Sequence, residues 1–369
     1  MSDLRDRLQE LAALPADRPK CMPGAFYTSQ DQFAHEARTV LRTGWHCLGR
    51  ADEIPEPGDF FTVQLLNEPL LVVRGDDGEV RVLANVCRHR GMPLAEGRGT
   101  AKRFVCSYHA WTYARDGALL RAPRMQNAGF DATTCTLPRH RVQLWNGFIY
   151  ATLDPASAPF AHPELDAMLA PYETADFRLV HVAEEDWRTN WKCLVENFME
   201  GYHLSVVHPH TLHGYTPSGL SRKLVSGDGY TSYAANYPAN IQPRGEGAPG
   251  LSAAERQRSS LFAKFPCQVA SQAASLLVSL SIFPVHASLI RVKWTMSVYG
   301  DSLDEATIAQ RIALWEEVNR EDREKLERLQ IALASDHAIE GPLAGDDYEG
   351  TIRDFQTWLA RQDAKCATA

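Results

Sequence analysis

The 369-residue sequence contains no long run of apolar residues. Its strongest apolar stretch, residues 273–285 (AASLLVSLSIFPV), is shorter than the roughly 18 residues of a membrane span and is interrupted by serines. The N-terminal stretch MSDLRDRLQELAALP is charged and lacks the apolar centre of a secretory signal peptide. We therefore expect no membrane association and a cytoplasmic location.

The sequence also lacks an excess of positive charge, because 38 basic residues stand against 46 acidic ones and the net charge is −8. No basic cluster stands out, so nucleic acid is not an expected partner. The sequence contains eight cysteines. The six other than Cys87 and Cys106 show no paired spacing, which argues against a disulfide framework. We find no strand–turn–helix unit carrying G-x-G-x-x-G, so we expect no binding domain for NAD(P)H.

The length exceeds that of one ordinary core and predicts two domains. Helical spacing over residues 3–14 and 30–43 predicts two N-terminal helices, which we assign to a segment 1–43 packed on the C-terminal domain. Short β-type runs separated by turn signals, among them 75–78 and 116–117, predict an all-β domain over 44–155. A Pro-rich connector at 154–163 leads into a region of mixed α and β character, which we take as a domain of residues 156–369.

Four candidate metal ligands lie in two short segments, Cys87-Arg88-His89 and Cys106-Ser107-Tyr108-His109. Two thiolates and two imidazoles suit either a structural zinc site or a Rieske [2Fe–2S] centre, in which one iron has two histidine ligands. A zinc finger takes both cysteines from one segment and both histidines from another, whereas here each segment supplies one of each. This arrangement fits a cluster held between two hairpin tips, with Cys87 and Cys106 on one iron and His89 and His109 on the other.

The residues that flank these ligands decide between the two kinds of site. Gly91-Met92-Pro93 follow the first pair and Ala110-Trp111-Thr112-Tyr113 follow the second. With them, the run CRHRGMPL…CSYHAWTY closely resembles the Rieske box. The resemblance implies a Rieske [2Fe–2S] cluster.

A second set of candidate ligands begins with His203 and His208, after a predicted helix at 190–202. Two histidines five residues apart point some 140° apart on an unbroken helix, at about 100° per residue, so both reach one metal only if the helix distorts or ends. Val206, Val207 and Pro209 favour an ending there. Two imidazoles plus one carboxylate leave positions open on a metal, as non-haem Fe(II) requires for binding O₂.

Spacing alone does not select the carboxylate ligand. Asp322 lies in a long amphipathic helix predicted over 302–334, with Glu321 and Glu324 beside it. Each candidate also has a purely structural interpretation. His208 can belong to a polar loop, Glu200 can cap a helix, and Asp322 can be one charge on a solvated face.

Taken together, NWK…EN…E-x-Y-H-x₄-H and the later E-D…Q resemble the catalytic domain of Rieske non-haem iron oxygenases. These proteins are the terminal oxygenase (alpha) subunits of ring-hydroxylating and demethylating systems. The resemblance implies that His203, His208 and Asp322 bind a mononuclear Fe(II). It also implies an α+β fold, in which an all-β Rieske domain precedes a helix-grip catalytic domain with an antiparallel sheet and a long C-terminal helix, and a homotrimer or a multiple of it.

The family places a carboxylate, normally an aspartate, three residues before the first iron-binding histidine. Here that residue is Glu200. By the resemblance, it connects His203 to His109 of the partner subunit, and a carboxylate between two metal-bound imidazoles can carry electrons and protons. Glutamate also stands there in members similar to carnitine and betaine oxygenases, which favours mono-oxygenation or demethylation.

The predicted function is therefore that of a terminal oxygenase acting with O₂ on a small organic substrate, an aromatic compound or a quaternary amine. Electrons are expected from a separate NAD(P)H-dependent reductase, with or without a ferredoxin. A cis-dihydroxylating dioxygenase is the first alternative, and an electron-transfer protein without oxygenase activity is a remote one. The alternating residues of 276–283 and 287–299 predict two paired antiparallel strands, and 214–250 reads as one long loop. We expect the pocket walls to come from 276–283, from 288–296 and from this loop, which offers Tyr215, Tyr230, Tyr233 and Tyr237.

Overall fold

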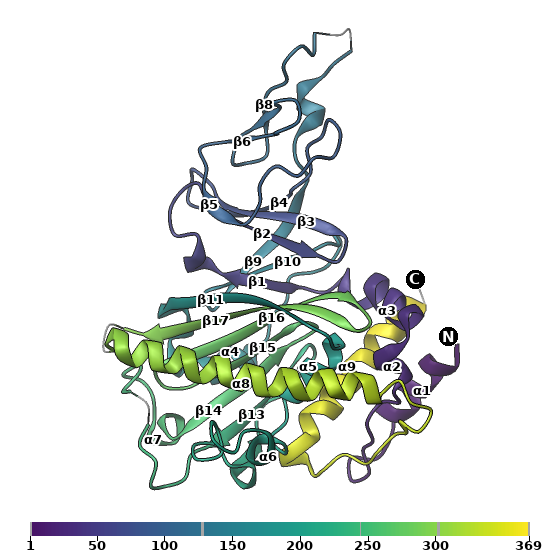
Figure 1. The fold of residues 1–369 in the computed structure, drawn as a ribbon, viewed down its shortest axis with the longest axis vertical. Helices are drawn as coiled ribbons and strands as arrows, with labels where there is room; N and C mark the ends of the chain where they lie inside the picture. The colour runs from purple at the N-terminus through teal and green to yellow at the C-terminus, as the bar shows by residue number, and fades with distance from the viewer. Residues whose placement is uncertain (1, 127–128, 244, 301–302, 368–369) are drawn as a thin grey trace. The chain divides into compact units, whose positions relative to one another are not determined.

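The computed structural model describes residues 2–126, 129–243, 245–300 and 303–367 (Figure 1). The chain forms two compact units. We call residues 47–159 the small unit and residues 1–46 together with 160–369 the large unit. Both are built on antiparallel sheets, and helices pack on the sheet of the large unit. This confirms the predicted α+β class.

The small unit contains a seven-stranded sheet in the order β1-β10-β9-β4-β3-β2-β5 and a three-stranded sheet in the order β6-β7-β8. Its strands are β1 (His46–Arg50), β2 (Asp59–Leu65), β3 (Glu68–Arg74), β4 (Val80–Ala84), β5 (Arg98–Thr100), β6 (Phe104–Val105), β7 (Thr112–Tyr113), β8 (Leu119–Arg121), β9 (Arg139–Trp145) and β10 (Phe148–Thr152). The turn signals at 75–78 and 116–117 connect β3 to β4 and β7 to β8 in antiparallel pairs, as predicted.

The large unit contains a seven-stranded antiparallel sheet in the order β11-β17-β16-β15-β14-β13-β12. Its strands are β11 (Phe177–Trp187), β12 (Ser221–Lys223), β13 (Tyr230–Asn236), β14 (Arg258–Lys264), β15 (Gln268–Gln272), β16 (Leu276–His286) and β17 (Leu289–Tyr299). From β12 onward each strand pairs with the next one along the chain, and β11 closes the far edge beside β17.

Helices of the large unit cover its sheet, and Figure 1 shows the long α8 lying across it. The α-helices are α1 (Ser2–Ala12), α2 (Ala25–Thr28), α3 (Gln30–Glu36), α4 (Pro163–Leu169), α5 (Trp191–Phe198), α6 (Leu204–Val207), α7 (Ala253–Arg256), α8 (Glu305–Ala332) and α9 (Asp346–Ala367). α5 contacts β15 and β16 of the sheet as well as α8 and α9. The helix that leads to the histidine pair is therefore enclosed.

Three sequence-based expectations need correction. The segment 214–250 is not one long loop, because it contains β12 and β13 of the main sheet. The strands β14 and β15 and the helix α9 were not predicted. The predicted helix 190–202 ends earlier, at Phe198, so the break comes before His203 and not between the two histidines.

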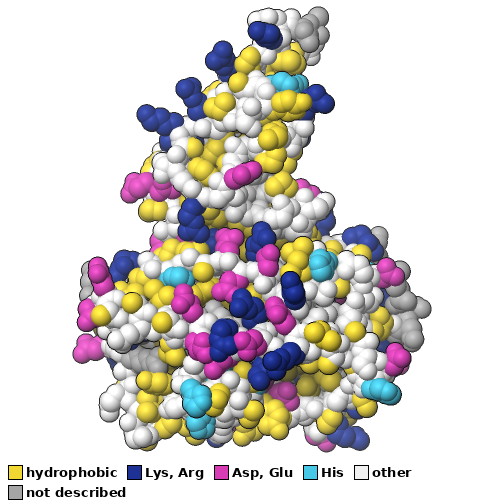
Figure 2. All heavy atoms as spheres, in the orientation of Figure 1, with side chains coloured by type: hydrophobic (Ala, Val, Ile, Leu, Met, Phe, Trp, Pro, Cys, Tyr) yellow, Lys and Arg dark blue, Asp and Glu magenta, His cyan; other side chains and the backbone are white. Residues whose placement is uncertain are grey.

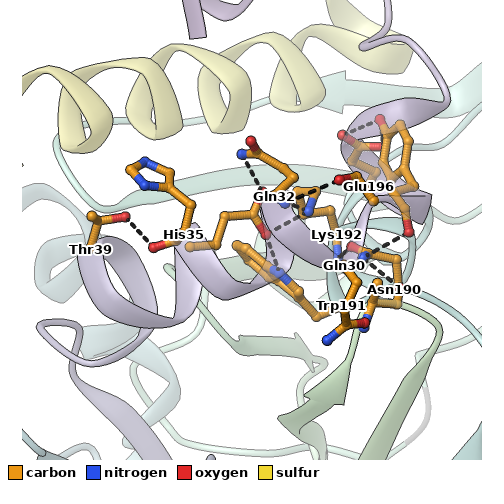
Figure 3. A network of polar contacts seen from close by, with 12 residues as sticks. Gln30, Gln32, His35, Thr39, Asn190, Trp191, Lys192 and Glu196 are labelled. Carbon is orange, nitrogen blue, oxygen red and sulfur yellow. Dashed lines mark hydrogen bonds and ion pairs between the residues drawn. The ribbon is translucent and has the colours of Figure 1, made fainter. Parts of the chain in front are cut away.

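A buried polar network fixes the start of α5 against the N-terminal segment (Figure 3). Lys192 is fully buried, and its Nζ lies 2.8 and 2.7 Å from the two carboxylate oxygens of Glu36 at the end of α3. Trp191 Nε1 donates to the same carboxylate at 3.0 Å, and Gln32 Nε2 does so at 3.1 Å. Asn190 caps α5, since its side chain accepts a hydrogen bond from Lys192 N at 3.0 Å.

The outer face of α8 is charged, and Figure 2 shows acidic and basic side chains intermixed over its middle. Arg320 lies between Glu317 and Glu324, one turn away on either side, and all three are about half exposed. The opposite face carries buried residues, among them Trp315, Asn319 and Asp322. Among the described helices, none combines the length and apolar character that crossing a membrane requires.

Candidate metal centres

The two segments of the Rieske-like box form turns of the same kind. Gly91 N donates to Cys87 O at 3.0 Å, and Ala110 N donates to Cys106 O at 2.9 Å. Each turn closes with a left-handed residue, Gly91 at φ 78° and Ala110 at φ 56°. That conformation is easy for glycine and uncommon for alanine, so the repeated geometry points to a shared requirement of the two loops.

The positions of the four candidate ligands of the box are compatible with a single metal cluster. The thiols of Cys87 and Cys106 are buried in the same apolar core, whereas His109 is exposed. Nδ1 of His89 and Nδ1 of His109 are 3.2 Å apart. Two imidazole nitrogens on one tetrahedral metal, with bonds of about 2.0–2.1 Å, lie about 3.3 Å apart. The residues therefore fit a metal between the two rings.

Two aromatic residues of the box support these ligands. Trp111 is buried, and its ring stacks on that of His89 at a centroid distance of 5.0 Å and an interplanar angle of 9°. Tyr113 is fully buried, and its hydroxyl lies 3.4 Å from Cys87 Sγ while accepting a hydrogen bond from Arg88 N at 3.0 Å. Trp111 thus orients an imidazole, and Tyr113 holds the first loop.

The second site begins where α5 is forced to end. A Cβ on Gly201 would lie 2.0 Å from Ser221 Oγ, so the chain passes too close to β12 for any side chain. Gly201 N donates to Tyr348 O at 3.1 Å, so its partner lies on α9 and not on the preceding turn. The helix therefore stops, and a separate short helix, α6, begins directly after His203.

This break brings His203 and His208 to one carboxylate of α8. Nε2 of His208 lies 3.1 Å from Asp322 Oδ1, and Nε2 of His203 lies 3.7 Å from the same atom. One ligand atom from each residue lies within 4.8 Å of the other two. Atoms bound to one metal at about 2.1 Å are about 3.0–3.6 Å apart for angles of 90–120°, so these residues fit a single metal ion.

Glu200 has two structural roles at this site. Its Oε1 contacts His203 Nδ1, and its Oε2 accepts hydrogen bonds from the backbone of Tyr202 and, at 3.0 Å, of His203. The predicted contact with the histidine is thus present, and the second carboxylate oxygen fixes the backbone just before α6. Burial lowers the pKa of His203, but the charge and hydrogen bond of Glu200 and the charge of Asp322 outweigh it and raise that pKa above its usual value.

Glu321 and Thr211 are site residues that sequence reasoning missed. Glu321 Oε2 lies 2.7 Å from His208 Nδ1, on the side of the ring opposite Asp322. The same oxygen accepts a hydrogen bond from Thr211 Oγ1 at 2.6 Å. The sequence contains no signal for this contact, because it does not show which of the adjacent acids Glu321 and Asp322 faces which nitrogen of His208.

A narrow cavity of about 40 Å³ lies in the large unit, and two of its lining residues are near the candidate ligands along the chain. Leu212 N donates to His208 O at 3.2 Å, and Trp315 lies two turns before Asp322 on the same face of α8. The lining side chains carry no charge; they are Leu212, Tyr215, Thr216, Tyr237, Ser259, Ser271, Ala273, Leu276 and Trp315. The predicted Tyr215 and Tyr237 are among them, whereas Tyr230 and Tyr233 hydrogen-bond elsewhere, to Glu164 and to the backbone before the histidines.

Comparison with protein-family models gives one match for each part of the chain. Residues 44–141 match the Rieske [2Fe-2S] domain, and residues 170–364 match the ring hydroxylating alpha subunit (catalytic domain). These descriptions agree with the two cofactors expected from the sequence, a Rieske [2Fe–2S] cluster and a mononuclear iron. The second match covers more than half of the chain.

Similar proteins include the carnitine monooxygenase oxygenase subunit of Escherichia coli (strain K12), with 34% identity over 52% of this chain and 56% of that protein. The glycine betaine monooxygenase oxygenase subunit of Chromohalobacter salexigens is 37% identical over 52% of this chain and 44% of its own length. The matched part thus spans about half the length of these relatives. The solved structure of a quaternary ammonium Rieske monooxygenase has the same fold, with a TM-score of 0.85, 23% identity and coverage of 96% of this chain and 98% of that chain.

Proposed function

The chain belongs to the ring-hydroxylating alpha subunit family, and from this premise we propose that it is the terminal oxygenase of a quaternary-amine monooxygenase. The observation that carries the proposal is the convergence of His203, His208 and Asp322. An uncharged, aromatic-lined cavity, to which α8 contributes Trp315, supports it. The names of the relatives and the glutamate at position 200 favour a quaternary amine over an aromatic hydrocarbon.

We assign the site residues as follows. Cys87, Cys106, His89 and His109 hold the [2Fe–2S] cluster in a domain spanning 44–155, and His203, His208 and Asp322 hold the mononuclear iron in a domain spanning 156–369. Residues 1–43 serve the second domain by fixing α5 through Glu36. When bound, the cluster supplies single electrons and the iron supplies the activation of O₂.

The side chains around the iron ligands orient them and hold protons. Since Glu200 and Glu321 contact Nδ1 of His203 and His208, each Nδ1 keeps its proton and each Nε2 presents its lone pair toward Asp322. We place Glu200 between His203 and His109 of the partner subunit, in a homotrimer or a multiple of it. Electrons arrive from a separate NAD(P)H-dependent reductase, directly or through a ferredoxin.

The cavity favours a cationic head group. Tyr215, Tyr237 and Trp315 offer aromatic faces, and a quaternary ammonium over such a face gains about 0.5–2 kcal/mol. The described lining offers no basic side chain for a carboxylate at this position. A carboxylate on the substrate would therefore have to lie outside this cavity.

Iron content and O₂ uptake test the proposal. The oxygenase should hold about three irons per chain, against about two for an electron carrier. With a compatible reductase, O₂ consumption should depend on added choline, betaines or carnitine and not on aromatic acids. A His203→Ala protein should keep the cluster absorbance and lose both one iron and the O₂ uptake. Full activity of that variant would refute the assignment.

A further inference from the structure

We propose that Glu321 is a positioning residue, which orients His208 for the mononuclear iron and joins that ligand to the segment lining the substrate cavity. The proposal rests on the proposed function, because it presumes a metal at His203, His208 and Asp322. It assigns a role to a residue that the resemblance leaves without one.

The position of Glu321 on the imidazole carries the argument. His208 is 1% exposed and lies between two adjacent residues of α8, with Glu321 Oε2 at 2.7 Å from Nδ1 and Asp322 Oδ1 at 3.1 Å from Nε2. A neutral imidazole has one N–H, and an acceptor at Nδ1 draws the proton there and leaves the lone pair on Nε2. Glu321 therefore selects the tautomer in which Nε2 can bind a metal.

A second hydrogen bond fixes Glu321 itself. Thr211 Oγ1 donates to the same carboxylate oxygen at 2.6 Å, and the Thr211 side chain is largely buried. Thr211 precedes Leu212, Tyr215 and Thr216, which line the cavity. Glu321 thus connects His208 to the segment that forms one cavity wall.

The chain offers a matched control in Glu324. It lies one turn after Glu321 on the same helix, but its side chain is 53% exposed and pairs with Arg320 on the outer face. Replacing Glu324 removes one negative charge from the same part of α8 and leaves the contacts of His208 intact. Any effect specific to Glu321 must then come from its contact with the ring.

The test measures metal affinity in the protein with its Rieske cluster in place. The mononuclear site is depleted with a chelator, and Co(II) is titrated anaerobically while its ligand-field absorption is followed and the cluster absorbance serves as reference. Glu321→Ala should weaken Co(II) binding about 10–100-fold and alter its spectrum, as loss of an outer partner of a metal-bound histidine does. Glu324→Ala should bind like wild type, and Thr211→Val should lie between the two.

The outcomes separate this proposal from the proposed function. If wild type and His203→Ala bind Co(II) equally, the mononuclear site itself is misassigned. If wild type binds and His203→Ala does not, while Glu321→Ala retains wild-type affinity and spectrum, the role of Glu321 is refuted. Should Glu321→Ala fail to fold, Glu321→Gln decides, because it keeps the shape and loses the charge; an affinity at least about 10-fold below wild type supports the proposal, and wild-type affinity overturns it.

Discussion

Replacing Lys192 with methionine should destabilise the large unit without touching a metal ligand. Lys192 and Glu36 are 0% and 3% exposed, and Nζ lies within 2.8 Å of both carboxylate oxygens. Removing one partner of a buried pair leaves an uncompensated charge, at a cost of about 3–5 kcal/mol. Because Trp191 and Gln32 still donate to Glu36, we place the loss at about 3 kcal/mol.

Chemical and thermal denaturation measure this loss. For a unit of this size, 3 kcal/mol corresponds to a fall of about 6–12 °C in the melting temperature. The control is Arg291→Ala, which removes the 2.9 Å ion pair with Asp186 between side chains that are both 48% exposed. An exposed pair contributes less than about 1 kcal/mol, so this variant should melt close to wild type.

A double variant separates the charge from the packing. Lys192→Met with Glu36→Gln removes both charges and keeps the volumes, so it should regain at least half of the lost stability. Two results would refute the reasoning. One is a Lys192→Met protein as stable as the Arg291→Ala control, and the other is a double variant no more stable than Lys192→Met alone.

Three further predictions concern pH, backbone conformation and the cavity. Burial raises the pKa of Glu196 to about 8, so between about pH 4.5 and 8 the folded state holds a proton that the unfolded state releases. The stability of wild type relative to Glu196→Gln should therefore fall with rising pH, by up to about 1.4 kcal/mol per pH unit, and parallel urea-denaturation curves from pH 5 to 8 would contradict this. Gly91→Ala should destabilise the small unit by about 1–2 kcal/mol in urea although its Cβ meets open space, because φ is 78°, whereas Gly99→Ala, without positive φ, should not. Trp315→Ala should raise the KM for a quaternary amine about 2–30-fold with little change for an uncharged analogue, and an equal rise for both would exclude a cation–π contact.

Sequence reasoning recovered β16 and β17 from the alternation of their residues. Both strands lie close to their predicted positions, 276–283 and 287–299. α8 begins at Glu305, three residues after its predicted start, and Asp304 caps it. By contrast, β13, β14 and β15 carry Thr231, Ser232, Ser260, Gln268 and Gln272 at fully buried positions. A central strand covered on both faces does not alternate apolar with polar residues, so its sequence resembles a loop.

α9 was missed for a different reason. Its buried residues Ile352, Phe355 and Leu359 recur at helical spacing, so the signal was available in the sequence. The break after α5 had no such local signal. It depends on Ser221 and Tyr348, which contact Gly201 only in the folded large unit, and spacing placed the break between the histidines for that reason.

The adjacent acids Glu321 and Asp322 show where local reasoning stops. Consecutive residues on a helix point about 100° apart, so two equal carboxylates one position apart normally serve different surroundings. Here the ring of His208 is inserted between their directions and contacts both, with Nδ1 toward Glu321 and Nε2 toward Asp322. Their roles are set by the orientation of a ring more than 110 residues earlier in the chain. The break at Gly201 and the turn at Thr211 create that orientation, so exchanging the two acids should abolish metal binding although composition and charge stay the same.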